Sequence, residues 1–257
     1  MKNEKNEKKN EIDKKRNYEI VKHNDLIQKS KYDLSTQEQK IILYLISKIK
    51  PGDEDFGFQE FEIKEFCKVC GIDDDNGGNY AALKKAVIDL SNKGFWVKVN
   101  TEYVSMRWIE KTRINTRSGI IKIKLDNDMK PYLLELKKHF TSYNLFYILA
   151  MKGKYSIRLY ELLKSYEALG GCTFEIERLK TSLGASKYNA IADFRVWVVD
   201  AAIREINAFS DVSVTYELVK QGRKYHSIDF SITPKYNLDP LENLKVLENI
   251  KIRLDGG

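Results

Sequence analysis

The sequence predicts an α+β fold in which one order of elements is used twice. The stretch "FEIKEFCKVCG" at residues 61–71 returns as "FEIERLKTSLG" at residues 174–184. Around both stretches the periodicity predicts a helix, a short strand, a short helix, a loop, a longer helix, and then strands joined by a turn. Because this agreement extends far beyond the two short stretches, we interpret it as a duplicated unit and not as a chance similarity between two strand-to-helix junctions.

The first unit begins with a helix whose start carries a capping box. Ser35 and Glu38 have the spacing at which each side chain satisfies a backbone N–H group of the first turn. A Pro-Gly pair at residues 51–52 ends this helix. The other elements predicted for this unit are a strand at residues 56–63, a helix at 64–71, a loop at 72–79, a helix at 80–94 and strands at 95–99, 103–114 and 120–125.

The second unit repeats the order and ends in a single hairpin. Its predicted elements are a helix at residues 153–166, a strand at 173–176, a helix at 177–184, a loop at 185–192, a long helix at 193–209 and strands at 212–219 and 225–232. Asp193 stands where it would cap the long helix, and Gly222 lies in the turn between the two strands.

A short helix, a turn, a longer helix and a hairpin form a winged helix-turn-helix, so the sequence predicts two tandem winged-helix domains. The chain of 257 residues is long enough for each domain to bury a core of its own. We place the N-terminal domain at residues 18–138 and the C-terminal domain at 139–235, between a disordered charged tail at 1–17 and a C-terminal tail at 236–257. Winged helices also serve as protein-binding modules, and the placement of charge decides between the two uses.

The net charge of +7 favours a polyanionic partner, and double-stranded DNA suits a helix that can enter a major groove. Candidate DNA-binding residues of the second domain are Lys187, Tyr188, Asn189 and Arg195 at the start of the long helix, Arg204 on a polar arc with Asp200 and Asn207, and Arg223 and Lys224 at the hairpin tip. The alternatives are a salt bridge of Arg195 to Asp193 or Glu205 and, for the two wing cations, a role in solubility alone.

The first domain adds a second basic surface. Its candidate DNA-binding residues are Lys84 and Lys85 on the longer helix and Arg107, Lys111, Arg113 and Arg117 in the strands and turn, with Lys98, Lys122 and Lys124 nearby. Two basic winged helices predict bipartite DNA binding, and a solvated charged face is the alternative for any one of these residues.

Catalytic and metal-binding classes find little support in the sequence. Cys67 and Cys70 form a CxxC without a second pair of ligands, so we expect buried structural thiols in a reducing cytosol. No phosphate-binding loop is present, and the acidic loop at residues 73–78 has Lys84 where a calcium loop needs Glu. With no apolar signal or membrane-spanning run, we expect a cytoplasmic protein that is not an enzyme and needs no cofactor or metal.

Several motifs together resemble those of the plasmid replication initiators of the Rep type-3 family. They are "NDLIQKSKYDLSTQEQKIILYLI", "YSIRLYELLKSY", "ADFRVWVVDAAIREIN" and a wing with "KQGRK", and they cover roughly residues 24–234. The resemblance implies two winged-helix domains with which monomers bind repeated origin sites called iterons. It also implies dimers, joined through the first domain, that often repress the initiator's own promoter, and it implies recruitment of host initiation factors and helicase without nuclease activity.

By motif position, the resemblance places Arg195 at the start of the DNA-reading helix. Members of the family often continue with more basic residues, whereas this chain has Val196 and Trp197. This departure shifts the expected DNA contacts toward Arg195, Lys187 and the wing. The function expected is therefore initiation of plasmid replication at iterons. A winged-helix transcriptional regulator and a protein-binding scaffold are the alternatives.

Overall fold

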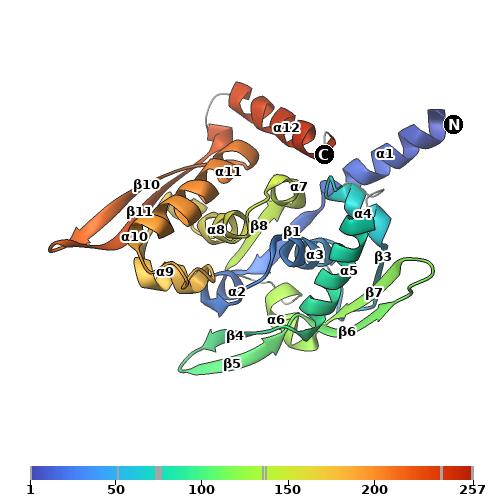
Figure 1. Ribbon diagram of the computed structural model, residues 1–257, viewed down its shortest axis with the longest axis horizontal. Helices are drawn as coiled ribbons and strands as arrows, with labels where there is room; N and C mark the ends of the chain where they lie inside the picture. Colours follow the sequence, from blue (N-terminus) through green and yellow to red (C-terminus); the bar gives the residue numbers. More distant parts are fainter. Residues whose placement is uncertain are drawn as a thin grey trace.

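The computed structural model describes residues 2–50, 52–72, 77–134, 136, 138–237 and 240–255 (Figure 1). The first half contains α1 (Lys2–Arg16), β1 (Glu19–His23), α2 (Asn24–Lys29), β2 (Ser30–Lys31), α3 (Thr36–Ile46), β3 (Gln59–Glu62), α4 (Ile63–Val69), α5 (Gly77–Asn92), β4 (Gly94–Val99), β5 (Glu102–Arg107), β6 (Ile109–Ile114), β7 (Ile120–Leu125), η1 (Asn127–Met129) and α6 (Lys130–Leu133). Residues 73–76 of the predicted loop at 72–79 lie outside the described residues. So does residue 51, the proline predicted to end the first helix.

The second half begins with β8 (Phe140–Asn144) and repeats the order of the first. It continues with α7 (Leu145–Ala150), α8 (Lys154–Lys164), η2 (Glu167–Leu169), β9 (Gly171–Glu175), α9 (Ile176–Ser182), α10 (Ile191–Phe194), η3 (Arg195–Asp200), α11 (Ala201–Phe209), β10 (Val212–Gln221), β11 (Lys224–Pro234), η4 (Lys235–Asn237) and α12 (Pro240–Asp255).

The duplicated unit is one strand and one helix longer than the sequence indicated. A strand and a short helix precede each unit, β1–α2 in the first and β8–α7 in the second, and both helices are capped by a side chain at the end of the strand. His23 Nδ1 accepts from the amide of Asp25 at 3.1 Å, and Asn144 Oδ1 accepts from the amide of Phe146 at 2.8 Å. The strands β1 and β8 pair with each other in antiparallel register, so the two units join through a shared two-stranded ribbon.

The C-terminal winged helix has the three-stranded order β10-β11-β9, with α9 and the long helix packed against it. The long helix runs as α10, a π-helical segment η3 and α11, so it contains one widened turn (Figure 1). The expectation that Asp193 caps this helix is wrong. The helix begins earlier, its N-cap is Ala190, and Asp193 lies inside the first turn, where a carboxylate still favours the positive end of the helix dipole.

The N-terminal half carries two hairpins and not one continuous run of strands. The predicted strand at residues 103–114 is wrong, because it bends at Trp108 and divides into β5 and β6, which belong to different sheets. Trp108 is 1% exposed and stacks on Phe95 at 4.3 Å between ring centroids, so burial of its indole holds the bend. The sheet β3-β7-β6 matches β9-β11-β10, which makes β6–β7 the wing and β4–β5 an additional hairpin.

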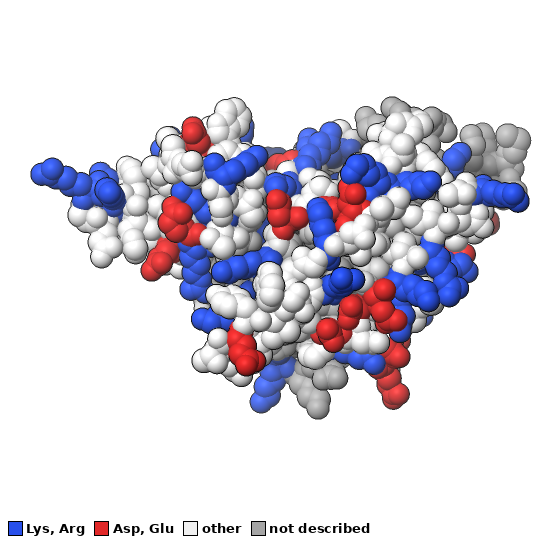
Figure 2. Space-filling model, turned by 60° about the horizontal axis from the view of Figure 1, so that its bottom comes forward, with Lys and Arg blue, Asp and Glu red and all other residues white. Residues whose placement is uncertain are grey.

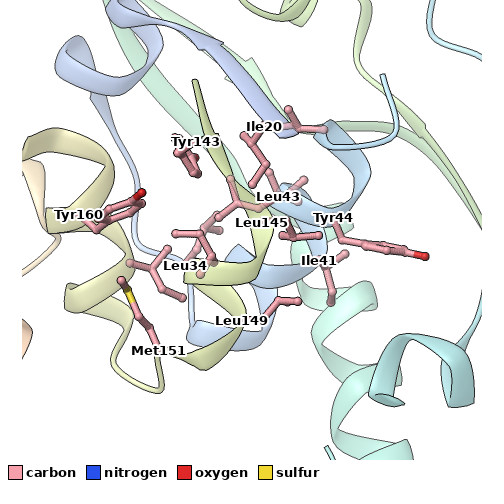
Figure 3. Close-up of a cluster of buried hydrophobic side chains, with 14 of the residues drawn as sticks. Ile20, Leu34, Ile41, Leu43, Tyr44, Tyr143, Leu145, Leu149, Met151 and Tyr160 are labelled. Carbon is pink, nitrogen blue, oxygen red and sulfur yellow. The ribbon is translucent and has the colours of Figure 1, made fainter. Parts of the chain in front are cut away.

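The hydrophobic core is continuous through both halves, so the expectation of two separate cores is wrong. The buried apolar residues form one cluster. Figure 3 shows its centre, where side chains from β1, α3, β8, α7 and α8 converge. The helix α3 is buried on nearly all sides, and the capping box at its start is present, with Glu38 accepting from the Ser35 amide at 2.7 Å. The two winged helices therefore pack as one body around the β1–β8 ribbon.

Both terminal segments are helical, and the expectation of a disordered tail at residues 1–17 is wrong. Arg16, at the end of α1, donates to the carbonyl oxygens of Val69 at 3.0 Å and Lys68 at 2.9 Å, and it pairs with Asp255 at 2.8 Å. The helix α12 packs on α7 and α11 and buries Val246, Ile250 and Leu254. The predicted C-terminal tail is thus a docked helix that contacts both halves.

The end of α12 lies directly on the turn of the first helix-turn-helix. Gly71 has a φ of +62°, and a Cβ there would lie 2.7 Å from the Leu254 carbonyl oxygen, so only glycine allows this approach. No helix in the described part of the chain has both the length and the apolar character that a membrane span requires.

Candidate nucleic-acid interface

The start of the long helix in the C-terminal half presents Arg195 to solvent. Its side chain is 48% exposed, and its Nε lies 3.8 Å from Asp200 Oδ2, so the carboxylate paired with it is that of Asp200 and not the expected Asp193 or Glu205. Asp200 is itself oriented by Tyr216 of β10, whose hydroxyl donates to Oδ1 at 2.6 Å. Because Asp200 sits one widened turn along the helix, the wing strand and the helix together position the Arg195 guanidinium.

The loop before this helix brings three further predicted residues alongside. Lys187 and Asn189 are exposed, and Tyr188 is half-buried with its ring 6.1 Å from Tyr155. The ammonium group of Lys187 lies 5.1 Å from the Tyr188 ring centroid, which supports the lysine without neutralising it. Lys187, Tyr188 and Asn189 thus flank the exposed N-terminal end of the helix.

The predicted polar arc of the long helix does not remain one surface. The Asn207 side chain is used by the fold, because it accepts from the Val214 amide at 2.7 Å and donates to the Val214 carbonyl at 2.9 Å. Arg204 is exposed and faces a hollow beside α12, next to Lys152 and Arg253. Arg204 therefore lies on a basic surface different from the one that Arg195 occupies.

The wing of the C-terminal half ends in exposed cations. Arg223 and Lys224 follow Gly222, whose φ of +65° forms the turn, and Lys220 stacks beside Tyr225 at 5.1 Å. Figure 2 shows the blue side chains gathered at the tip of this hairpin, at the far left. No described carboxylate pairs with Arg223 or Lys224, so their charge is available to a ligand.

The predicted residues of the N-terminal half separate into three groups. Arg113 and Arg117 lie on the β6–β7 wing with Lys111, and the Arg113 guanidinium lies 5.0 Å from the Phe58 ring. Arg107 is exposed but lies on the additional hairpin β4–β5. On α5, Lys84 is half-buried, and the exposed Lys85 forms an ion pair with Asp89.

Two lysines on β7 are paired and do not form the open basic face that their alternation indicated. Lys122 Nζ lies 2.6 Å from Glu60, and Lys124 Nζ lies 2.8 Å from Glu110. Each carboxylate comes from a neighbouring strand of the same sheet. Part of the basic excess of this half is therefore already compensated within the fold.

The structure also brings together cations that sequence reasoning did not combine. A cleft of about 530 Å³ between the halves is lined by Gln28, Lys29, Ser30, Lys31, Lys98, Tyr103, Glu177, Arg178, Thr181 and Ser182. The ammonium of Lys31 lies 5.2 Å from the Tyr103 ring. These residues come from α2, β2, the β4–β5 hairpin and α9, so no local pattern could have shown that they meet.

Cys67 and Cys70 are buried thiols, as the sequence predicted. Burial raises the pKa of Cys70 to about 12, which keeps it as a thiol and a poor metal ligand or nucleophile. Within the described ranges, no three His, Cys, Asp or Glu side chains are grouped closely enough to hold a metal ion.

Two winged helices on one core, each with an exposed basic wing, define a protein of the tandem winged-helix class. The family model "Initiator Replication protein, WH1" matches residues 19–164, and "Initiator Rep protein, WH2" matches residues 175–232. The chain therefore belongs to the replication initiator family to which its motifs were similar.

Two known proteins show the same likeness. A replication initiation protein of Escherichia coli is 24% identical over 226 residues, which covers 82% of this chain and 68% of that protein. The crystal structure of the Pi initiator protein in complex with iteron DNA has a TM-score of 0.70 at 20% identity, and the match covers 85% of this chain and 98% of that one. The latter likeness confirms the predicted fold of two tandem winged helices.

Proposed function

We propose that this protein initiates plasmid replication by binding repeated double-stranded origin sites with both winged helices. The observation that carries the proposal is the pair of exposed basic wings on a chain that belongs to the initiator family. The Pi initiator, which shares the fold, was crystallised with iteron DNA. Two domains on one continuous core suit such a site, because each domain can occupy one of two neighbouring major grooves.

The contacts divide by position on the molecule. The start of the long helix reads base edges through Arg195, supported by Lys187, Tyr188 and Asn189, since helix N-termini approach bases and phosphates closely. Contacts to phosphate are assigned to Arg223, Lys224, Arg204, Lys84, Lys85, Arg107, Lys111, Arg113 and Arg117. The interdomain cleft adds Lys31, Lys98 and Arg178 as backbone contacts between the two half-sites.

Dimerisation through the N-terminal domain and repression of the protein's own promoter form part of the proposal. The strand β5 is the edge of the sheet β2-β4-β5 and carries exposed Tyr103 and Val104. An uncovered edge strand with apolar side chains suits pairing with a second copy. Host initiation factor and helicase are the further partners, and the cytoplasm is the compartment in which the protein acts.

The domain boundary at residues 138/139 fits the repeat of elements, because β8 and α7 open the second unit as β1 and α2 open the first. The WH1 family model runs further, to residue 164, and so includes α8. We propose the boundary at residues 138/139 because it assigns α8 to the second unit, where it corresponds to α3 of the first. With the 138/139 boundary the β1–β8 ribbon joins the two units, whereas the family model includes both strands in WH1.

Footprinting on the DNA that flanks the gene tests the proposal. We expect protection of tandem repeats and a loss of affinity of roughly a thousandfold between 50 and 200 mM salt, if ~6 phosphates are neutralised. The protein supplied in trans should then restore replication to a plasmid that carries the repeats but lacks the gene. Binding without replication would favour a transcriptional regulator, and the absence of binding to any duplex would favour a protein scaffold.

A further inference from the structure

A buried ion pair joins the two halves of the molecule beside the β1–β8 ribbon. Lys22 on β1 and Glu161 on α8 lie with Nζ 2.6 Å from Oε1, and each side chain is 1% exposed. Tyr143 on β8 donates to the same carboxylate oxygen, and Tyr32 donates to the other at 3.3 Å. Although burial opposes ionisation, the charges of Lys22 and Arg158 hold the pKa of Glu161 below its usual value, so it stays a carboxylate.

Arg158, one turn earlier on α8, extends this group across the junction. Its Nη2 donates to the carbonyl oxygens of Ile27 at 2.7 Å and Ser30 at 3.1 Å in the N-terminal half. Its Nε donates to the Ser182 carbonyl at 3.3 Å in the C-terminal half, and its guanidinium lies 4.5 Å from the Tyr32 ring. One side chain, 2% exposed, thus links three segments from both sides of the junction.

A buried group of this kind restricts the relative position of the two halves more than it adds to the free energy of unfolding. Two charges taken out of water lose hydration that their attraction only partly offsets, and apolar replacements of buried pairs are often as stable. Apolar contacts tolerate small sliding movements, whereas directional bonds to charged groups in a low dielectric permit one arrangement. Lys22, Arg158 and Glu161 lie where the two units meet, so the arrangement they fix is that of one winged helix relative to the other.

We propose that Lys22, Arg158 and Glu161 are positioning residues that fix the angle between the two winged helices, and thereby set the spacing between half-sites that the protein accepts. This inference rests on the proposed function. The continuous core and α12 keep the halves together, so loss of the ion pair widens the range of angles without separating them.

The chain offers a matched control in a second ion pair between the halves. Lys154 Nζ lies 2.6 Å from Asp33 Oδ1, but these side chains are 30% and 65% exposed. Exposed ion pairs are screened by water and salt, so they restrict the relative position of the two halves only weakly. Neutralising this pair removes the same charges from the same junction and should leave the angle unchanged.

The first experiment measures the angle without DNA. Spin labels at Thr116→Cys and Gln221→Cys, with Cys172 replaced by Ala, report the distance between the two wing tips by pulsed electron resonance. We expect one narrow distance distribution for the parent protein and for Asp33→Asn with Lys154→Met. We expect a broad distribution for Lys22→Met with Glu161→Gln, at a similar melting temperature.

A single substitution tests the same inference if the Lys22→Met, Glu161→Gln variant does not fold. Arg158→Lys keeps the charge but is too short to reach both the Ile27 and Ser30 carbonyls, and it should broaden the distribution to an intermediate extent. A narrow distribution in a folded Lys22→Met, Glu161→Gln variant would overturn the inference. An equal broadening in the exposed-pair control would overturn it as well.

The second experiment uses the repeat found by footprinting and the same repeat with one base pair inserted between its half-sites. One base pair rotates the second half-site by about 34–36° and shifts it by about 3.4 Å, so we expect the parent protein to lose affinity about 100-fold. The Lys22→Met, Glu161→Gln variant should lose about 10-fold, because a wider range of angles accommodates the shift. Equal discrimination by the two proteins would refute the inference and leave the proposed function standing. Failure of the parent protein to bind any repeat would remove the proposed function, while the distance measurement still tests the angle.

Discussion

The two winged helices differ mainly in how their basic side chains are held. In the N-terminal half, Lys85, Lys122 and Lys124 each pair with a carboxylate on the same helix or on a neighbouring strand. In the C-terminal half, Arg223 and Lys224 are exposed at the wing tip, and no described carboxylate forms an ion pair with them. A lysine that is already paired with a carboxylate attracts phosphate only weakly, so we expect Lys85, Lys122 and Lys124 to contribute less to DNA binding than Arg223 and Lys224.

The halves also differ in the local structure around their candidate DNA-binding residues. The C-terminal long helix has a widened turn that brings Arg195 within 3.8 Å of Asp200, and Tyr216 of the wing holds Asp200. The N-terminal half has the bend at Trp108, which directs β4–β5 away from the wing β6–β7. The same order of elements therefore supports an exposed arginine at the start of the long helix in one half and an additional hairpin beside the cleft in the other.

The largest effect expected is on stability, from Trp108→Ala. Removal of a fully buried indole should cost about 3–5 kcal/mol in the free energy of unfolding. Because the core is continuous, both halves should unfold together in one transition, which denaturant titration followed by circular dichroism checks.

The matched control for this variant is Trp96→Ala on the adjoining β4–β5 hairpin. Trp96 is 53% exposed, so the change should lie within about 0.5 kcal/mol. An unfolding curve with two transitions, the first of which unfolds only the N-terminal half, would contradict the conclusion that both halves share one core.

Specific DNA affinity should depend more on Arg195 than on Lys85. Arg195→Ala should weaken binding to the origin repeat by about 1–3 kcal/mol if the guanidinium reads a base, and it should relax selectivity at that base. Lys85→Ala should change affinity by less than about 0.5 kcal/mol, because Asp89 already neutralises this lysine. Fluorescence anisotropy with matched and mismatched duplexes measures both values, and equal losses would remove the distinction between the two halves.

A smaller effect is expected when lysines and arginines are removed in pairs from the two wings. Arg223→Ala with Lys224→Ala should reduce the magnitude of the negative slope of log K against log salt by about 1.8, since each phosphate contact contributes about 0.9. Lys122→Ala with Lys124→Ala should lower it by much less, because Glu60 and Glu110 compete for these lysines. Binding at four salt concentrations gives the slopes, and a larger decrease for the N-terminal pair would reverse the comparison.

Local signals in the sequence were sufficient for most of the fold. The capping box of Ser35 and Glu38, the two Phe-Glu-Ile junctions and the Gly222 turn each depend on neighbouring residues, and each was confirmed. The bend at Trp108 could not be predicted in this way. It depends on aromatic stacking with Phe95 on another strand, a contact that the local sequence does not show.

The candidate site was harder to predict from the sequence, because a basic side chain can bind DNA only if no carboxylate of the fold already pairs with it. The pairing of Lys122 with Glu60 joins residues that are distant in the chain, and the cleft residues Lys31, Lys98 and Arg178 meet only through the packing of the two halves. The helical ends of the chain were missed for a related reason. The segment 1–17 is polar by composition, yet Arg16, the last residue of α1, is fixed by carbonyl groups of α4.

The smallest effect, and the closest test of the C-terminal reading surface, is expected from Tyr216→Phe. The change removes the hydrogen bond to Asp200 but keeps the ring, so Arg195 should be less well positioned and specific affinity should decrease by about 1 kcal/mol. Burial, together with Asp200, raises the pKa of Tyr216 above its usual value near 10, so its neutral hydroxyl is favoured in the folded protein. The stabilisation from this shift is complete below pH 10 and is lost only as the pH rises above it. Affinity for the origin repeat measured from pH 7 to pH 9 should therefore show no step from Tyr216 in the parent protein, and the deficit of the Phe variant should stay constant across that range. A deficit that disappears by pH 9 would show that the hydroxyl ionises and that Asp200 is held by another group.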